Sequence, residues 1–300
     1  MDLSIIIVNW NTSRLLQQCL NSIYSARICV AFEVIVVDNG SSDDSLSLIA
    51  EHFPAVIIIK NDRNLGFARA NNQGISVGLG RYFMLLNTDT IVLPGAVDAL
   101  IQIADRHPEL GVVGPKLLNM DNTIQKSWAS FPSLLSELVG KNFRIRHPVA
   151  NSPHAYEVDW IMGACMLVRS ATIEEVGKLD EDYFFYSEEI DWCFRIKKKN
   201  WKIWYISNAE IYHIGGGSAN RARFIQLIRL YQGKLLYFQK YHGSFMTTLL
   251  RYGLAAANTL GVIRRLIFFN WLNRQAAAQR IADQSKLVWC LLWNRYPKTG

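Results

Sequence analysis

The sequence lacks the features that mark several common classes of protein. Its five cysteines are scattered along the chain and form no Cys-x-x-Cys pair. This spacing argues against a zinc site and a disulfide framework, and it fits a reducing cytoplasm. Only 8 of the 300 residues are proline, while half of the residues are hydrophobic. We therefore expect no long disordered segment.

The glycine-rich phosphate loops of two nucleotide-binding classes are also missing. No Gly-x-Gly-x-x-Gly motif follows the first apolar run, where the chain instead has Asn9-Trp10-Asn11, and no Walker A motif occurs. A dinucleotide cofactor bound on the usual glycine turn is therefore disfavoured. The first apolar run follows an acidic residue, Asp2, and not a basic flank, so we expect no secretory signal peptide.

Acidic residues are nearly absent from the last part of the chain. Residues 218–300 contain 13 Lys and Arg against one acid, Asp283, which gives a net charge of +12. Residues 1–217 contain 19 basic and 24 acidic residues, a net charge of −5. Such asymmetry indicates an anionic partner for the C-terminal part, either a membrane surface or a nucleic acid.

What the sequence does contain is a regular alternation of apolar runs and helical patterns. Four apolar runs each end at a polar loop, and a segment of helical spacing follows; the runs are residues 3–8, 32–37, 55–59 and 82–86. This alternation predicts an α/β fold with a mostly parallel sheet and helices on both faces. The spacing of Ser41 and Asp44 predicts a capping box at the second helix.

The pattern after the fourth run is less regular. It predicts a helix over residues 94–104, short strands within 111–118, and two short strands over 201–206 and 209–213. The weak pattern and the prolines of residues 121–155 predict a variable loop region.

The fourth apolar run stops at Asn87-Thr88-Asp89. Ligands bind at the carboxyl ends of strands in open α/β sheets, and Asn87 and Asp89 point the same way in extended chain. Two oxygen ligands on one side suit Mg²⁺ or Mn²⁺. A turn rich in Asn and Asp is the alternative, and the stretch alone favours neither.

A second cluster of acids follows the aromatic run 183–186. Glu188, Glu189 and Asp191 stand within four residues, after Ser187 as a predicted helix N-cap. Acids in a first turn also favour the helix dipole. Apolar neighbours and like charges raise the pKa of a carboxyl group, however, which makes a base competent near neutral pH. We therefore favour a functional role.

Two further positions are candidates for ligand contact. A lone histidine is usually structural, but His213 ends a predicted strand before a glycine-rich loop, which makes it a better ligand candidate than most. Trp160 is a candidate for stacking on a sugar ring, with burial in the core as an equal alternative. Gly163 is able to bring backbone close to a ligand.

Together these motifs resemble those of family-two glycosyltransferases of the GT-A fold, and within them the rhamnosyltransferase-like branch. The matching segments occur in the family's order between residues 3 and 218: 7–11, 37–41, 64–71, 86–89, 160 with 163–164, 184–191, and 213 with 215–216. Each motif is weak alone, but seven in sequence are specific. The resemblance implies a GT-A-type, Rossmann-like catalytic domain over residues 1–217.

The resemblance implies a nucleotide diphosphate sugar as donor, either a dTDP- or a UDP-sugar. The residues that it assigns to donor binding are Val8, Asn9, Asn11, Asp38, Asn64, Gly66, Arg69, Asn87 and Thr88. Asn9, Asn11 and Asp38 would meet the base and ribose, and Asn64 and Arg69 would lie near the diphosphate. Trp160, Gly163 and Tyr186 are assigned to the acceptor.

The resemblance also implies a divalent metal, Mg²⁺ or Mn²⁺. Asn87-Thr88-Asp89 takes the place of the family's Asp-x-Asp motif, and His213 that of its third metal ligand. Glu188-Glu189 replaces an acidic pair whose second member deprotonates the acceptor hydroxyl. Two residues depart from the pattern: Asn87 carries no charge, and Glu189 is longer than Asp. Asp191 is close enough to stay open as the base.

The implied activity is an inverting transfer of a sugar, with rhamnose as one candidate, to a hydroxyl of a glycan, such as a lipid-linked polysaccharide or O-antigen precursor. A non-catalytic sugar-nucleotide-binding or scaffold protein is the alternative that Asn87 keeps open. A sugar-phosphate nucleotidyltransferase is a further alternative, but it needs a glycine-rich basic loop that residues 9–12 do not supply.

Residues 218–300 are predicted to form a basic helical extension. An amphipathic helix is predicted over 221–241. The uncharged stretch 252–263 is too short for a bilayer span, which needs ~20 apolar residues. Helices rich in Arg, Trp and Phe without acids favour an interfacial position on an anionic membrane. We therefore expect a cytoplasmic protein, peripheral on the inner face of the plasma membrane. Helices packed on the catalytic domain are the alternative, and nucleic-acid binding is disfavoured because no known module matches.

Overall fold

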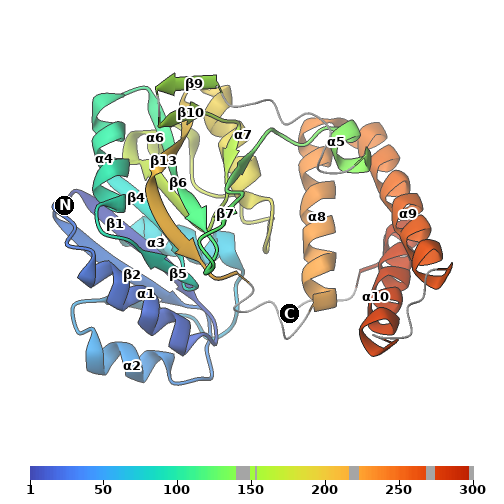
Figure 1. Cartoon of the computed structure of the whole chain (residues 1–300), viewed down its shortest axis with the longest axis horizontal. Coiled ribbons are helices and arrows are strands. Elements are labelled where there is room, and N and C mark those ends of the chain that lie inside the picture. The colour runs from blue at the N-terminus through green and yellow to red at the C-terminus, as the bar shows by residue number, and fades with distance from the viewer. Residues whose placement is uncertain (140–148, 153, 216–222, 268–273, 297–300) are drawn as a thin grey trace. The chain divides into compact units, whose positions relative to one another are not determined.

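The computed structural model describes residues 1–139, 149–152, 154–215, 223–267 and 274–296 (Figure 1). The chain divides into two compact units. One unit comprises residues 1–131 and 146–221 and is named the catalytic unit after the domain that the resemblance implies; the other, the helical unit, comprises residues 132–145 and 222–300. The predicted domain boundary at residue 217 differs from this division in one respect: the segment that starts at Pro132 groups with the C-terminal helices.

The first half of the catalytic unit is the predicted alternation of strand and helix. The elements are β1 (Leu3–Asn9), α1 (Ser13–Ser25), β2 (Phe32–Asp38), α2 (Ser45–His52), β3 (Ile57–Lys60), α3 (Phe67–Val77) and β4 (Tyr82–Asn87). The four strands are parallel in the order β3-β2-β1-β4. This part confirms the α/β prediction, because each apolar run became a strand.

The second half extends the sheet with strands of both directions. It contains β5 (Thr90–Val92), α4 (Ala96–Arg106), β6 (Leu110–Leu118), β7 (Ile124–Gln125), β8 (Trp128–Ala129), β9 (Val149–Ser152), β10 (Ala155–Glu157), β11 (Trp160–Ile161), β12 (Cys165–Arg169), α6 (Ser170–Val176), α7 (Glu188–Lys198) and β13 (Lys202–His213). β12 runs antiparallel to its neighbours β4 and β6, and β13 runs parallel to β6. β6 and β13 therefore point the same way as β1 and β4.

Two apolar cores lie on the two faces of the sheet, because alternate residues of a strand face opposite sides. Ile5 and Ile7 of β1 pack in one core with residues of α1 and α4. Ile6 packs in the other with residues of α3 and α7. A Cβ atom on Gly74 of α3 would lie 2.5 Å from Ile6 Cγ2, so packing against the sheet accounts for this glycine.

Several details differ from the sequence predictions. Residues 202–213 form one strand with a register shift between Ile206 and Glu210, in place of two short strands. The loop predicted over residues 121–155 contains β7, β8 and the helix α5 (Leu134–Val139). The capping box is wrong: the helix N-cap is Asp44, and it makes no side-chain cap bond. Ser187 is an N-cap without a cap bond as well.

The helical unit consists of α5 with α8 (Arg223–Tyr241), α9 (Gly243–Ile267) and α10 (Arg274–Trp293). The helices pack on one another through buried residues such as Ile228 of α8, Leu254 of α9 and Leu291 of α10. A Cβ atom on Gly253 would lie 2.4 Å from Leu138 Cδ2, so α5 lies directly against α9. No helix in the described part of the chain has the length and apolar character needed to cross a membrane.

Candidate functional site

Strand ends from both halves of the catalytic unit meet at one edge of the sheet. Asn9 at the end of β1 pairs in register with Asp38 at the end of β2. Asn87 ends β4, and its backbone N–H donates to the carbonyl of Ala164, just before β12, at 3.0 Å. His213 ends β13, which runs in the same direction. The topology thus gathers the predicted donor and metal residues, because parallel strands end at a common edge.

Asn9 and Asp38 are fully buried and shape the first two loops. Asn9 Nδ2 donates to Asp38 Oδ1 at 2.9 Å, and the backbone N–H of Ser41 donates to Asp38 Oδ2 at 3.0 Å. The Ser41 hydroxyl, expected in a capping box, instead accepts from the Asn11 backbone N–H at 3.0 Å. Asn11 Oδ1 in turn accepts from the backbone N–H of Ser42. Direct contact of Asn9, Asn11 and Asp38 with a nucleotide stays a prediction.

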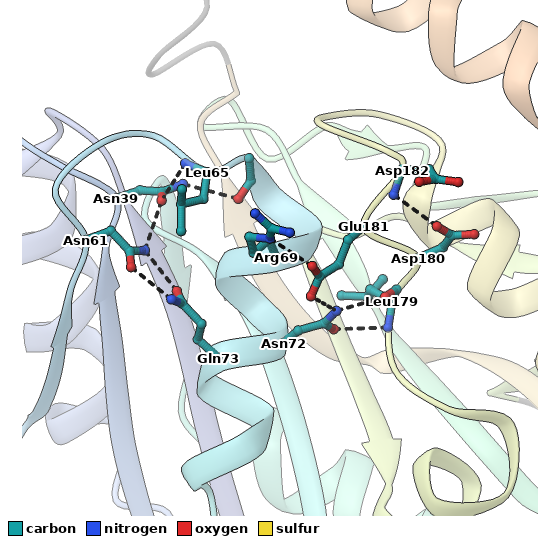
Figure 2. Close-up of polar contacts among 11 residues, drawn as sticks. Asn39, Asn61, Leu65, Arg69, Asn72, Gln73, Leu179, Asp180, Glu181 and Asp182 are labelled. Atoms are coloured by element: carbon teal, nitrogen blue, oxygen red, sulfur yellow. Dashed lines mark hydrogen bonds and ion pairs between the residues drawn. The ribbon is translucent and has the colours of Figure 1, made fainter. Parts of the chain in front are cut away.

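The loop after β3 is fixed by a second set of amide contacts, centred on Asn39 (Figure 2). Asn39 Nδ2 donates to Asn64 Oδ1 at 3.0 Å, and Asn39 Oδ1 accepts from the backbone N–H of Leu65 at 3.0 Å. Asn64 Oδ1 also accepts from the backbone N–H of Gly66. Asn39 was not among the predicted site residues, although its place directly after β2 is a signal that pointed to it.

Helix α3 anchors the segment that leads into α7. Arg69 Nε forms an ion pair with Glu181 Oε2 at 2.8 Å, and Asn72 bonds to the backbone of Leu179 through both amide atoms (Figure 2). Gly66 has φ of +90°, and a Cβ atom on it would lie 2.6 Å from the carbonyl oxygen of Phe184. Arg69 thus holds the loop before α7, and its predicted contact with a diphosphate stays untested.

Asp89 and His213 face each other directly. His213 Nε2 lies 3.3 Å from Asp89 Oδ1, and each side chain is 12% exposed. The backbone N–H of Ile214 donates to the Asp89 carbonyl at 2.9 Å, which ties the two loops together. Within the described residues, no group of three or more His, Cys, Asp or Glu side chains is placed to hold a metal. The protein therefore offers two close ligands of the kind that Mn²⁺ accepts, with Asn87 two residues before Asp89.

Glu188 and Glu189 are the first two residues of α7, and each has a buried carboxyl oxygen. Burial, together with the charge of Glu189, raises the pKa of Glu188 well above its usual value. Burial raises the pKa of Glu189 to about 7, against lowering by backbone hydrogen bonds. One carboxyl oxygen of each has no hydrogen-bond partner in the described structure. A Cβ atom on Gly163 would lie 3.7 Å from Glu189 Cβ, so Glu189 lies against the turn before β12.

Asp191 has a different environment from its two neighbours. Its side chain is fully buried and forms an ion pair with Arg195 Nε at 2.8 Å. Arg195 also donates to the carbonyls of Val176 and Lys178. The pair thus joins α7 to the end of α6 and the chain beyond it. This arrangement favours a structural role for Asp191 and Glu189 as the base.

Asp191→Asn should therefore destabilise the catalytic unit by ~3–5 kcal/mol, because breaking a buried pair leaves Arg195 without its counter-charge. Thermal or urea unfolding measures the loss. Glu51→Gln, at an exposed position on α2, is the control and should change stability by less than ~0.5 kcal/mol. Unchanged stability in Asp191→Asn, combined with lost transfer activity, would return Asp191 to the list of candidate bases.

The predicted acceptor residues Trp160, Gly163 and Tyr186 are each partly buried. The Trp160 indole N–H donates to the Ser130 carbonyl at 3.0 Å, and its ring packs against the second core. Tyr186 and Ser187 both have φ of +74°. Two consecutive left-handed residues that are not glycine are strained, and such strain gathers at functional sites. The turn that they form sets the start of α7 and thus the position of Glu188.

The sequence profile of glycosyl transferase family 2 matches residues 4–177, more than half of the chain. The chain belongs to glycosyl transferase family 2. This match confirms the resemblance drawn from the motifs, and it covers the sheet edge from Asn9 to Asn87 and the Gly163 turn.

Curated relatives of this family-2 chain include enzymes of glycan synthesis. An N-acetylglucosaminyl-diphospho-decaprenol L-rhamnosyltransferase of Mycobacterium tuberculosis is 28% identical over 249 residues, 76% of this chain and 81% of the relative. The low-salt glycan biosynthesis hexosyltransferase Agl10 of Haloferax volcanii is 28% identical over 223 residues, 71% of this chain and 67% of the relative.

Solved structures show the same GT-A fold at low sequence identity. The mannosyltransferase PcManGT from Pyrobaculum calidifontis, in complex with GDP-Man and Mn²⁺, has a TM-score of 0.60 and 14% identity, with 98% of this chain and 88% of that chain covered. S. aureus TarS 1-349 has a TM-score of 0.53 and 14% identity, with 99% and 93% covered. These likenesses confirm the predicted fold class for this glycosyltransferase.

Proposed function

We propose that the protein transfers a hexosyl residue, with rhamnose as one candidate, from a dTDP- or UDP-sugar to a hydroxyl group of a glycan acceptor. The similarity to an N-acetylglucosaminyl-diphospho-decaprenol L-rhamnosyltransferase supports a lipid-linked acceptor. The observation that carries the proposal is a carboxyl group with a raised pKa beside the sheet edge where the ends of β1, β2, β4 and β13 meet. Glu189, with a pKa of about 7, lies against the Gly163 turn, whose next residue bonds to the end of β4.

The reaction that this geometry supports is a single displacement. Glu189 takes the proton from the acceptor hydroxyl, and the oxygen attacks the anomeric carbon opposite the departing nucleoside diphosphate. The configuration at that carbon is therefore inverted. We assign the base to Glu189, whose pKa of about 7 lets it ionise near neutral pH, while burial and the neighbouring charge raise the pKa of Glu188 well above its usual value.

A divalent metal fits the residues at this edge. Asp89 and His213 would hold Mg²⁺ or Mn²⁺, since their facing atoms lie 3.3 Å apart and are mostly shielded from solvent. When bound, the metal neutralises charge on the diphosphate and so helps the nucleotide to leave. The structure of PcManGT, which was solved with GDP-Man and Mn²⁺, supports this assignment.

The decisive experiment measures release of nucleoside diphosphate and product formation with a panel of nucleotide sugars, with and without Mg²⁺ or Mn²⁺. Turnover that requires both a donor and a divalent metal supports the proposal. Nucleotide binding without metal dependence, and without turnover on any acceptor, would support the scaffold alternative instead. Anomeric analysis of the product tests inversion.

We also infer that the helical unit lies on an anionic membrane surface. Six exposed apolar residues of α9 are separated by three, four or eight positions, spacings that keep them on one side of the helix and so form one stripe along it. They are Phe245, Leu249, Tyr252, Leu260, Ile263 and Ile267, each at least 44% exposed. The stripe is about 33 Å long at 1.5 Å per residue. The net charge of +12 over residues 218–300 complements anionic lipids, which form the surface in which a lipid-linked acceptor would be anchored.

Replacing Leu260 and Ile263 together with serine should weaken binding to vesicles of anionic phospholipid by about 100-fold, since each apolar side chain contributes ~1.5 kcal/mol or more when buried. Co-sedimentation measures the change. Leu79→Ser, at a 74% exposed apolar position of the catalytic unit, is the matched control and should bind normally. Normal vesicle binding by the double variant, with a loss of self-association in analytical ultracentrifugation, would show that the stripe pairs two copies instead.

A further inference from the structure

A chain of polar side chains leads from the surface to His213. It runs along the hairpin that joins β6 to β7, whose strands pair through Leu117 with Gln125. The contacts, in order, are Thr123 Oγ1 to Asp121 Oδ1 at 2.5 Å, Asn119 Nδ2 to Thr123 Oγ1 at 2.8 Å, Gln125 Nε2 to Asn119 Oδ1 at 3.0 Å, and His213 Nδ1 to Gln125 Oε1 at 2.5 Å.

The direction of the first links is fixed by the carboxylate at the surface end. Hydrogen bonds from the side chain and backbone of Thr123 lower the pKa of Asp121, so Asp121 is ionised and only accepts. The Thr123 hydroxyl therefore uses its one hydrogen to donate a hydrogen bond to Asp121. Its oxygen is left to accept, and Asn119 must present its N–H₂ group to it.

The same reasoning continues to the imidazole ring. Because Asn119 points its N–H₂ group at Thr123, its oxygen faces Gln125, and Gln125 must turn its own N–H₂ group that way. That group also lies 3.5 Å from the backbone carbonyl of His213, a second acceptor on the same side. The oxygen of Gln125 is left facing His213 Nδ1, so Nδ1 must carry the proton.

We propose that residues 119–125 are a positioning element that holds His213 as the Nδ1–H tautomer, so that an unprotonated Nε2 faces Asp89 as a ligand for a divalent cation. This role rests on the proposed function of the Asp89–His213 pair. In the neutral ring, the Nε2 lone pair then points at a carboxylate oxygen 3.3 Å away. Two such groups repel, and a cation between them removes the repulsion.

Gln125→Leu tests the last link, since leucine is similar in size but offers no acceptor. Nitrogen-15 NMR of labelled histidine, at a pH of about 9 where an unperturbed imidazole is neutral, reports the tautomer. The spectrum of His213→Gln identifies the signals of His213 among the 6 histidines. We expect Nδ1–H in the native chain and a shift toward Nε2–H in Gln125→Leu. Mn²⁺ binding, followed by electron paramagnetic resonance of the free ion, should weaken ~10–100-fold.

Gln125→Glu is the conservative partner for the last link, because a carboxylate still accepts from Nδ1; it should keep the Nδ1–H tautomer, although it loses the N–H₂ contacts with Asn119 and the His213 carbonyl. Thr123→Val removes the hydroxyl that orients Asn119 and should shift the tautomer in part, while Thr123→Ser should not. An Nε2–H ring in the native chain, or an unchanged tautomer in Gln125→Leu, would overturn the proposal. An Nδ1–H ring in a chain that never binds Mn²⁺ would leave the positioning element intact and reject the metal-dependent function.

Discussion

Asp89→Ala should reduce kcat/KM for sugar transfer by about 10³-fold or more, because a bound metal contributes several kcal/mol to stabilisation of the transition state. The structure makes this residue hard to replace. Asn87 carries no charge, and the side chain that faces Asp89 is His213, whose Nε2 lies 3.3 Å from Asp89 Oδ1. The variant should also lose the dependence of donor binding on Mn²⁺, which calorimetry with and without the metal measures.

Two comparisons separate this effect from a general loss of structure. Asp89→Asn keeps the shape and removes only the charge, so it should lose metal dependence while its unfolding temperature stays near the native value. Glu51→Ala, at an exposed position far along the chain on α2, should keep full activity. Metal-dependent turnover at the native rate in Asp89→Ala would remove the basis of the proposed site.

The strand-end positions in the first half of the site followed from the sequence, because each depends on a local signal. An apolar run that stops at a polar loop defines both a strand and its carboxyl end, and this signal placed Asn9, Asp38 and Asn87 correctly on β1, β2 and β4. The parallel arrangement then required them to share an edge. The profile match over residues 4–177 covers the same half.

The parts that sequence reasoning missed depend on tertiary contacts. Gln125 lies in a two-residue strand, too short for any periodic pattern, and its importance comes from His213, which is 88 positions away. Likewise Ser41 has the spacing of a capping residue, but the neighbouring loop supplies Asn11 as a better partner. Such choices are set by which strand ends become neighbours, and a local pattern does not contain that information.

The choice between Glu189 and Asp191 was open for the same reason. Both stand in the first turn of a predicted helix with the same sequence neighbours. The structure separates them, because Arg195 lies 2.8 Å from Asp191 on the same helix, whereas Glu189 faces the Gly163 turn. The Asp191 carboxylate is thus held in an ion pair with Arg195, whereas burial raises the pKa of Glu189 to about 7.

Glu189→Gln should lower kcat by about 10²–10⁴-fold, since that is the usual contribution of a general base, while the donor and Mn²⁺ bind as before. The dependence of kcat/KM on pH in the native enzyme also tests whether Glu189 is the base. A base must be ionised to act, so kcat/KM should fall about tenfold per pH unit below a midpoint near 7 and level off above it. The rate with Glu189→Gln should lack this rise, which initial-rate assays across the pH range will show.

The pH dependence of the free energy of unfolding is an independent test of Glu189. The raised pKa of this residue determines whether stability rises or falls with pH. Between the ordinary glutamate pKa and about 7, the folded state binds a proton that the unfolded state releases, so stability falls as pH rises through this window. Glu189→Gln removes that loss and should raise the unfolding temperature above pH 7. Glu188→Gln leaves Glu189 in place, so its activity profile should keep a midpoint near 7. A native profile with an acidic midpoint, or an active Glu189→Gln enzyme, would assign the proton transfer to another group.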